Sequence, residues 1–79
     1  MERVKIRDAL KKALVLSGMK QSVLSEKLGV TQASISGNLN RAHPSGDTLV
    51  STLKIMGYVV AIGKMDGDRF TPIFELDNE

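Results

Sequence analysis

The segment QSVLSEKLGVTQASISGNLNR, residues 21–41, is the part of the chain from which the fold is predicted. It reads as two short helices, Gln21–Leu28 and Gln32–Leu39, joined by a tight turn. Gly29 stands where a helix ends and the backbone needs the left-handed conformation. Thr31 is a good N-cap for the second helix, because its hydroxyl can accept a hydrogen bond from a free N–H there. The spacing is that of a helix-turn-helix.

The two faces of this segment differ in chemistry. The apolar spacing predicts that the inner face carries Val23, Leu24, Leu28, Ile35 and Leu39. The outer face of the second helix is expected to carry only small or amide side chains without charge: Gln32, Ala33, Ser34, Ser36, Gly37 and Asn38. A solvated helix face usually carries charged side chains. We therefore expect this face to lie against a surface that offers both donors and acceptors.

The segment resembles the phage-repressor-type family of DNA-binding domains, also called Cro-like, lambda-repressor-like or XRE domains. The resemblance rests on residues that open the helices, form the turn or anchor the second helix: Gln21, Gly29, Val30, Thr31, Gln32 and Ile35. One position departs, because Ser25 stands where the family usually has Ala. Serine is nearly as small, so we expect the packing against the turn to survive.

Two further helices are predicted on either side of this segment. Val4–Ser17 has an apolar stripe at helical spacing and ends at Gly18, and the stripe consists of Ile6, Ala9, Leu10, Ala13 and Leu14. Thr48–Met56 is capped by Ser45 or Asp47, ends at Gly57, and is expected to bury Leu49, Val50, Leu53 and Met56.

After Gly57 the pattern changes to that of a β-hairpin, with strands over Tyr58–Lys64 and Arg69–Leu76. Asp66-Gly67 is a strong turn signal, and it predicts the pairs Val60 with Ile73, Ala61 with Pro72, and Val59 with Phe74. One face would then carry Val59, Ala61, Phe70, Phe74 and Leu76. A lone hairpin is barely stable, so we expect the helices or another chain to cover this face.

Two details of the second strand can also be predicted. Pro72 lacks an N–H, which indicates an edge or a bulge. Residues 77–79 are expected to be a frayed end.

The fold class is thus predicted to be mainly α with a small β element. The expected architecture is a four-helix, lambda-repressor-like bundle at 4–57, followed by a β-hairpin at 58–76, in a single domain of residues 1–79. Some small repressors and antitoxins of the resembled family dimerise through such a strand or hairpin. The resemblance therefore implies a homodimer, with an interface formed by Tyr58, Val59, Val60, Ala61, Ile62, Phe70 and Phe74.

The amino-acid composition argues against several classes of function. The chain has no Cys and a single His, so we expect no disulfide, no metal site, no cofactor and no enzymatic activity. No apolar run approaches the roughly 20 residues of a membrane span, and the first 12 residues are too charged for a signal peptide. We expect a cytoplasmic protein, associated with the nucleoid when it is bound to DNA.

Charge is distributed unevenly along the chain. Residues 1–43 hold eight Lys or Arg against three Asp or Glu, whereas residues 44–79 hold three against six. A basic half that contains the helix-turn-helix suits a protein whose first half contacts phosphates.

These observations predict a sequence-specific, double-stranded DNA-binding transcriptional regulator of repressor type, from a phage or prophage. Its second helix would lie in the major groove, and a dimer would bind a near-palindromic operator. Base contacts are expected from Gln32, Ala33, Ser34, Ser36, Gly37 and Asn38. Phosphate contacts are expected from Lys20, Ser22, Thr31, Asn40 and Arg41, and the resemblance adds Gln21.

Two alternatives stay open at this point. The protein could be the antitoxin of a toxin–antitoxin pair, which binds its own operator and also a toxin. It could also be a protein-binding module that has lost DNA binding. Neither the operator nor the sign of regulation follows from the sequence.

Overall fold

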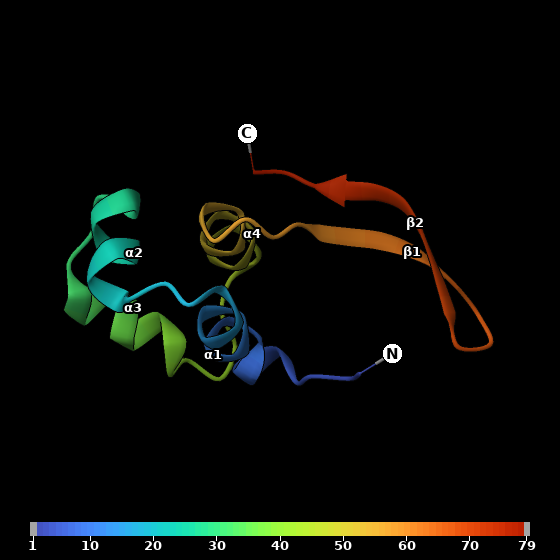
Figure 1. Ribbon diagram of the computed structural model, residues 1–79, viewed down its shortest axis with the longest axis horizontal. Helices are drawn as coiled ribbons and strands as arrows, with labels where there is room; N and C mark the ends of the chain where they lie inside the picture. Colours follow the sequence, from blue (N-terminus) through green and yellow to red (C-terminus); the bar gives the residue numbers. More distant parts are fainter. Residues whose placement is uncertain (1, 79) are drawn as a thin grey trace.

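Four helices are followed by a two-stranded antiparallel hairpin in the computed structural model, which describes residues 2–78 (Figure 1). The elements are α1 (Ile6–Ser17), α2 (Gln21–Leu28), α3 (Gln32–Leu39), α4 (Gly46–Ile55), β1 (Val60–Asp66) and β2 (Arg69–Leu76). The predicted fold class, mainly helical with a small β element, is confirmed at this level. Met1 and Glu79, the ends of the predicted domain, lie outside the described residues.

The predicted bounds hold for α2, α3 and β2 and shift for the other elements. α1 begins at Ile6 rather than at Val4. α4 begins at Gly46, because the capping residue is Ser45, whose Oγ accepts a hydrogen bond from the Thr48 N–H at 3.2 Å. β1 occupies residues 60–66 rather than 58–64.

The turn between α2 and α3 forms as its residues predict. Gly29 has a φ of 70°, and the Thr31 hydroxyl accepts a hydrogen bond from the Ser34 N–H at 3.1 Å. Ser25 is 6% exposed, and its hydroxyl donates to the carbonyl of Ser22 at 2.9 Å, so burial leaves no unpaired polar group there. The Ser25 carbonyl also accepts a hydrogen bond from the Val30 N–H at 3.0 Å, so Ser25 packs against the turn.

The core lies between the four helices and consists of Leu10, Ala13, Leu24, Ile35, Leu39 and Met56. Two residues that were predicted to point inward do not. Ile6 is 63% exposed and Val23 is 38% exposed. Both lie in the first turn of their helices, before the first core residue of each helix, Leu10 in α1 and Leu24 in α2.

The hairpin turn is centred on Gly67 and Asp68, one residue later than predicted, and Asp66 pairs with Arg69. Gly67 has a φ of 63°. Among residues 2–78, no residue other than glycine has a positive φ, so the φ of Asp68 is negative. Glycine with positive φ at the first central position, followed by a residue with negative φ, is the signature of a type II′ turn. The predicted register is therefore wrong, and Val60 pairs with Leu76 instead of Ile73.

A bulge in β2 shifts the register once more. Ile62 pairs with Phe74 and Gly63 pairs with Pro72, so Ile73 is left as the extra residue. Phe74 and Leu76 consequently share a face with Ile62 and Val60, whereas Phe70 lies on the opposite face with Gly63. The predicted apolar face is wrong for this reason, while the prediction of an edge or bulge at Pro72 is confirmed.

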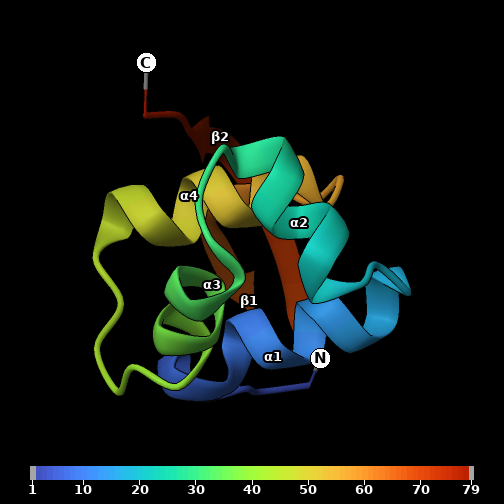
Figure 2. The same ribbon diagram turned by 90° about the vertical axis from the view of Figure 1, so that its left-hand side faces the viewer.

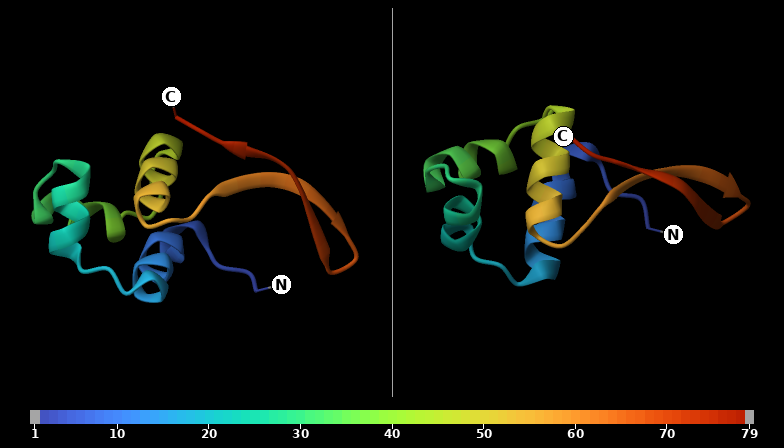
Figure 3. Two further views of the ribbon diagram at one scale, coloured as in Figure 1. Left: turned by 45° about the horizontal axis from the view of Figure 1, so that its top comes forward. Right: turned by 90° about the horizontal axis from the view of Figure 1, so that it is seen from above.

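The hairpin projects away from the helices (Figure 1, and both views of Figure 3), which leaves Phe74 54% exposed. The molecule is elongated, with extents of 41 × 25 × 23 Å. The two residues that follow the C-terminal end of β2 contact α4. Lys54 and Asp77 form an ion pair at 2.8 Å, and the side-chain amide of Asn78 donates a hydrogen bond to the Ser51 hydroxyl. The predicted frayed end is thus wrong for residues 77 and 78.

Candidate nucleic-acid interface

The outer side of α3 is an exposed, uncharged strip. Ile35 and Leu39 are buried against the other helices, which turns the opposite side of the helix to solvent. The exposed positions of the strip are Gln32, Ala33, Ser34, Ser36 and Gly37. Figure 2 views the molecule from this end, with α2 and α3 in front of the hairpin. The strip is accessible over its whole length and is remote from the hairpin.

Asn38 is the one predicted base-contact residue that is half-buried. It lines a hollow of about 220 Å³ together with Leu28 and Val30 of the preceding segment and with Asp47 and Thr48 of α4. Asn38 therefore belongs to the border between α3 and α4 rather than to the centre of the exposed strip.

The two residues that follow α3 have different surroundings. The side-chain amide of Asn40 donates to the carbonyl of Ser36 at 2.8 Å and so caps the end of the helix. The Arg41 backbone N–H donates to the carbonyl of Asn38 at 3.3 Å, and Arg41 is exposed. The capping role of Asn40 was missed from the sequence, because Asn40 has a φ of −96° and caps through its side chain rather than as a left-handed residue.

The start of α2 has free backbone donors. The first backbone hydrogen bond of α2 runs from the Leu24 N–H to the Lys20 carbonyl at 3.0 Å, and within residues 2–78 no side chain caps this helix. The N–H groups of its first turn therefore face solvent beside three exposed residues: Lys20, Gln21 and Ser22. Such a helix start attracts anionic oxygens.

The charged residues nearest to the strip along the chain lie at its borders and not within it. No residue from Leu28 to Asn40 carries a charge, and the nearest cations along the chain are Lys27 and Arg41. Thr31 is exposed while it caps α3, so its hydroxyl hydrogen stays available to an outside acceptor. The arrangement can bind a surface with anions at its edges and mixed donors and acceptors in its centre.

The described part of the chain has neither a metal-ligand cluster nor a membrane-spanning helix. Between residues 2 and 78, no group of three His, Cys, Asp or Glu side chains lies close enough to hold a metal ion. In the same residues, every helix is too short or too polar to cross a lipid bilayer.

The residues predicted for dimerisation lie on the hairpin and its approach. Four of them are exposed: Tyr58, Val59, Ile62 and Phe74. The other three are half-buried: Val60, Ala61 and Phe70. Phe70 is covered in part because its ring lies over Gly63 on the neighbouring strand.

Comparison of the chain with protein-family models, with curated proteins and with solved structures found no match. The functional assignment therefore depends on the residues and geometry described above.

Proposed function

We propose that the protein is a sequence-specific, double-stranded DNA-binding regulator of repressor type. The observation that carries the proposal is the outer strip of α3, which is exposed, uncharged, and built from small and amide side chains. A helix of this kind fits the major groove, whose base edges present donors, acceptors and thymine methyl groups. The finer fold assignment, a lambda-repressor-like bundle, is part of the same proposal.

The base contacts come from the strip. The amide of Gln32 pairs with adenine through N6 and N7, and Ala33 contacts a thymine methyl group. Ser34 and Ser36 donate or accept, and Gly37 allows the helix to approach closely because it has no side chain. Asn38 reaches base edges only from the border of the strip, since it is half-buried.

The phosphate contacts surround the strip. The free N–H groups at the start of α2, with Lys20, Gln21 and Ser22, bind one phosphate region. Thr31, Asn40 and Arg41 bind phosphates at the two ends of α3. Because the side-chain N–H of Asn40 already caps α3, Arg41 is the stronger contact at that end. Phosphate contacts position the protein, and base contacts provide the specificity.

The protein acts as a homodimer through its hairpin. The exposed apolar residues Ile62 and Phe74 form a cross-strand pair that no helix covers, which supports this part of the proposal. A twofold dimer would bind half-sites whose centres are about 34 Å apart on one face of the DNA.

The exposed hairpin also favours a second candidate function, the binding of another protein such as a toxin. An antitoxin would bind DNA with α3 and its protein partner with the hairpin. A module that has lost DNA binding would use the hairpin or the strip for protein contacts only.

Mapping of backbone amide shifts by NMR tests the proposal without knowledge of the operator. A mixed-sequence duplex is added to the labelled protein at low salt. We expect the shifts to concentrate at residues 20–22 and 31–41. Shifts confined to the hairpin or to α1, or no shifts with any duplex, would contradict the proposal.

A further inference from the structure

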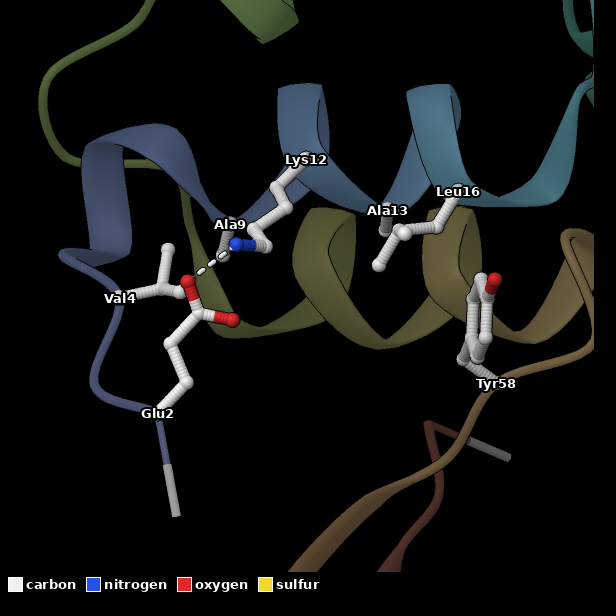
Figure 4. Close-up of a pocket in the computed structure, with 7 residues that line it drawn as sticks. All are labelled: Glu2, Val4, Ala9, Lys12, Ala13, Leu16 and Tyr58. Atoms are coloured by element: carbon white, nitrogen blue, oxygen red, sulfur yellow. Dashed lines mark hydrogen bonds and ion pairs between the residues drawn. The ribbon is translucent and has the colours of Figure 1, made fainter.

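An apolar groove lies along α1, where the N-terminal arm and the chain entering β1 flank the helix (Figure 4). Its volume is about 290 Å³. Its apolar lining includes Val4, Ala9, Leu16 and Tyr58, and the ion-paired Glu2 and Lys12 also line it. Leu16 is 68% exposed although it is apolar, so the groove has apolar surface that nothing in the described chain covers.

The hairpin has one edge that is suited to pairing with another strand. On β2, the bulge at Ile73 and the missing N–H of Pro72 interrupt the row of backbone groups. β1 has seven residues without Pro or a bulge residue of its own. Unpaired strand edges of this kind add further strands readily. Both strands of this two-stranded sheet have an outer edge, and the free edge that is uninterrupted is that of β1.

Full antiparallel overlap of β1 with a second β1 fixes the register. Val60 must then lie opposite Asp66 of the second copy, and the twofold axis passes through Gly63. In a two-residue turn the closing pair, Asp66 with Arg69, is hydrogen-bonded, and the bonding directions alternate from there along the strand. Ala61, Gly63 and Met65 consequently direct their N–H and C=O groups to the free edge. A twofold axis at Gly63 therefore places these outward-directed groups of one β1 opposite those of the other β1.

The same register brings the hairpin tip of the second copy to the groove. If Gly63 lies on the axis, Tyr58 lies opposite residue 68 of the second copy. Near the helices, β1 lies nearer than β2 to the N-terminal arm, so its outer edge is on the arm's side of the hairpin (Figures 1 and 3, left view). We propose that the α1 groove binds the hairpin tip, residues 65–70, of a second copy of this chain. This inference rests on the proposed homodimer and specifies its geometry.

The net charges of the two regions and an exposed apolar side chain support the hairpin tip of a second copy as the occupant of the groove. Residues 2–17, which form the arm and α1, hold five Lys or Arg against two Asp or Glu. Residues 58–78, which form the hairpin and its ends, hold two against four. The tip also presents Met65, a flexible apolar side chain that is exposed in the single chain and can fill an irregular groove.

Disulfide trapping tests the proposal directly, because the chain has no Cys of its own. Two single-cysteine variants, Leu16→Cys in the groove and Asp68→Cys at the tip, are mixed and oxidised. The matched control is a mixture of Leu16→Cys with Glu75→Cys, which places the thiol on the exposed hairpin away from the tip. All three positions are exposed, and circular dichroism checks that each variant folds.

The expected result is a disulfide-linked dimer that forms several-fold more in the Leu16→Cys and Asp68→Cys mixture than in the control mixture or in either variant alone. Equal yields in the two mixtures, from protein that sediments as a dimer, would overturn the groove assignment while leaving the homodimer intact. A chain that sediments as a monomer would overturn both. Neither outcome depends on DNA, so a failure of the DNA-binding proposal is detected separately by the amide-shift mapping.

Discussion

Thr31 and Asn40 fix the two ends of α3, the helix that carries the candidate interface. Thr31 caps the first turn through its hydroxyl, and Asn40 caps the last turn through its amide. The sequence predicts the first cap, because Thr directly before a helical pattern is a strong start signal. The second cap was assigned only a phosphate role, because an exposed Asn after a helix can serve either purpose.

Gln32 is the residue whose removal should affect sequence preference most clearly. Gln32→Ala removes the proposed bidentate contact to adenine and should cost about 1–3 kcal/mol on the specific duplex, with relaxed preference at one base pair. Fluorescence anisotropy with matched and mismatched duplexes measures this. Ser22→Ala is the matched control, since loss of a phosphate contact should weaken binding to all duplexes alike. Unchanged specific binding in Gln32→Ala would mean that α3 does not read the bases.

Arg41 should act on affinity without changing specificity. Arg41→Ala removes the proposed phosphate contact, so binding to all sequences should weaken similarly and the salt slope should fall by about one unit. Binding isotherms at several salt concentrations give the slope. Lys64→Ala removes an exposed cation on the hairpin and serves as the control. Equal slopes for wild type and Arg41→Ala would exclude a phosphate contact at this residue.

At the scale of elements, helix positions were easier to predict than strand pairing. The left-handed Gly29 and the Thr31 cap are local signals, and they predict the end of α2 and the start of α3 to the residue. The sequence Asp66-Gly67-Asp68 permits a two-residue turn at 66–67 or at 67–68, and cross-strand packing decides which of the two forms. The bulge at Ile73 then reverses which side chains share a face, and no local signal specifies the size of that shift.

Gly63 is the position where the two strands leave no room for a side chain. A Cβ there would lie 2.3 Å from the Thr71 carbonyl oxygen and 2.6 Å from Cε2 of Phe70. Gly63→Ala should therefore destabilise the fold by about 1–3 kcal/mol through overpacking, measured by urea unfolding. Gly46→Ala, whose Cβ would meet nothing within 4 Å, should be neutral or stabilising. Equal stability of the two variants would contradict the close approach of β1 and β2.

At the scale of the whole molecule, the hairpin and the α2–α3 pair lie at opposite ends of the long axis (Figures 1 and 2). A dimer formed through the hairpin therefore leaves α3 free to contact DNA. A chain of 79 residues buries little surface by itself, so association is also a natural source of stability. The sequence predicted that a hairpin follows α4, but the register of its strands and its projection away from the helices are properties of the whole fold.

Thermal stability should depend on protein concentration, because a dimer is stabilised by mass action. We expect the Tm of the full chain to rise with concentration. Ile62→Asp, which puts a charge on the strand with the free edge, should flatten that dependence. Ile73→Asp changes an exposed bulge residue on the other strand and should leave the concentration dependence of the Tm unchanged. A Tm that is independent of concentration in the wild type would contradict the dimer.

Sequence-specific DNA binding is tested by selection of bound duplexes from a random DNA pool, at low and at moderate salt. We expect enrichment of one inverted-repeat motif that survives moderate salt, as for a specific dimeric binder. Weak binding without enrichment, which disappears as the salt concentration rises, would contradict sequence-specific binding. The basic first half of the chain would then provide only nonspecific attraction to nucleic acid.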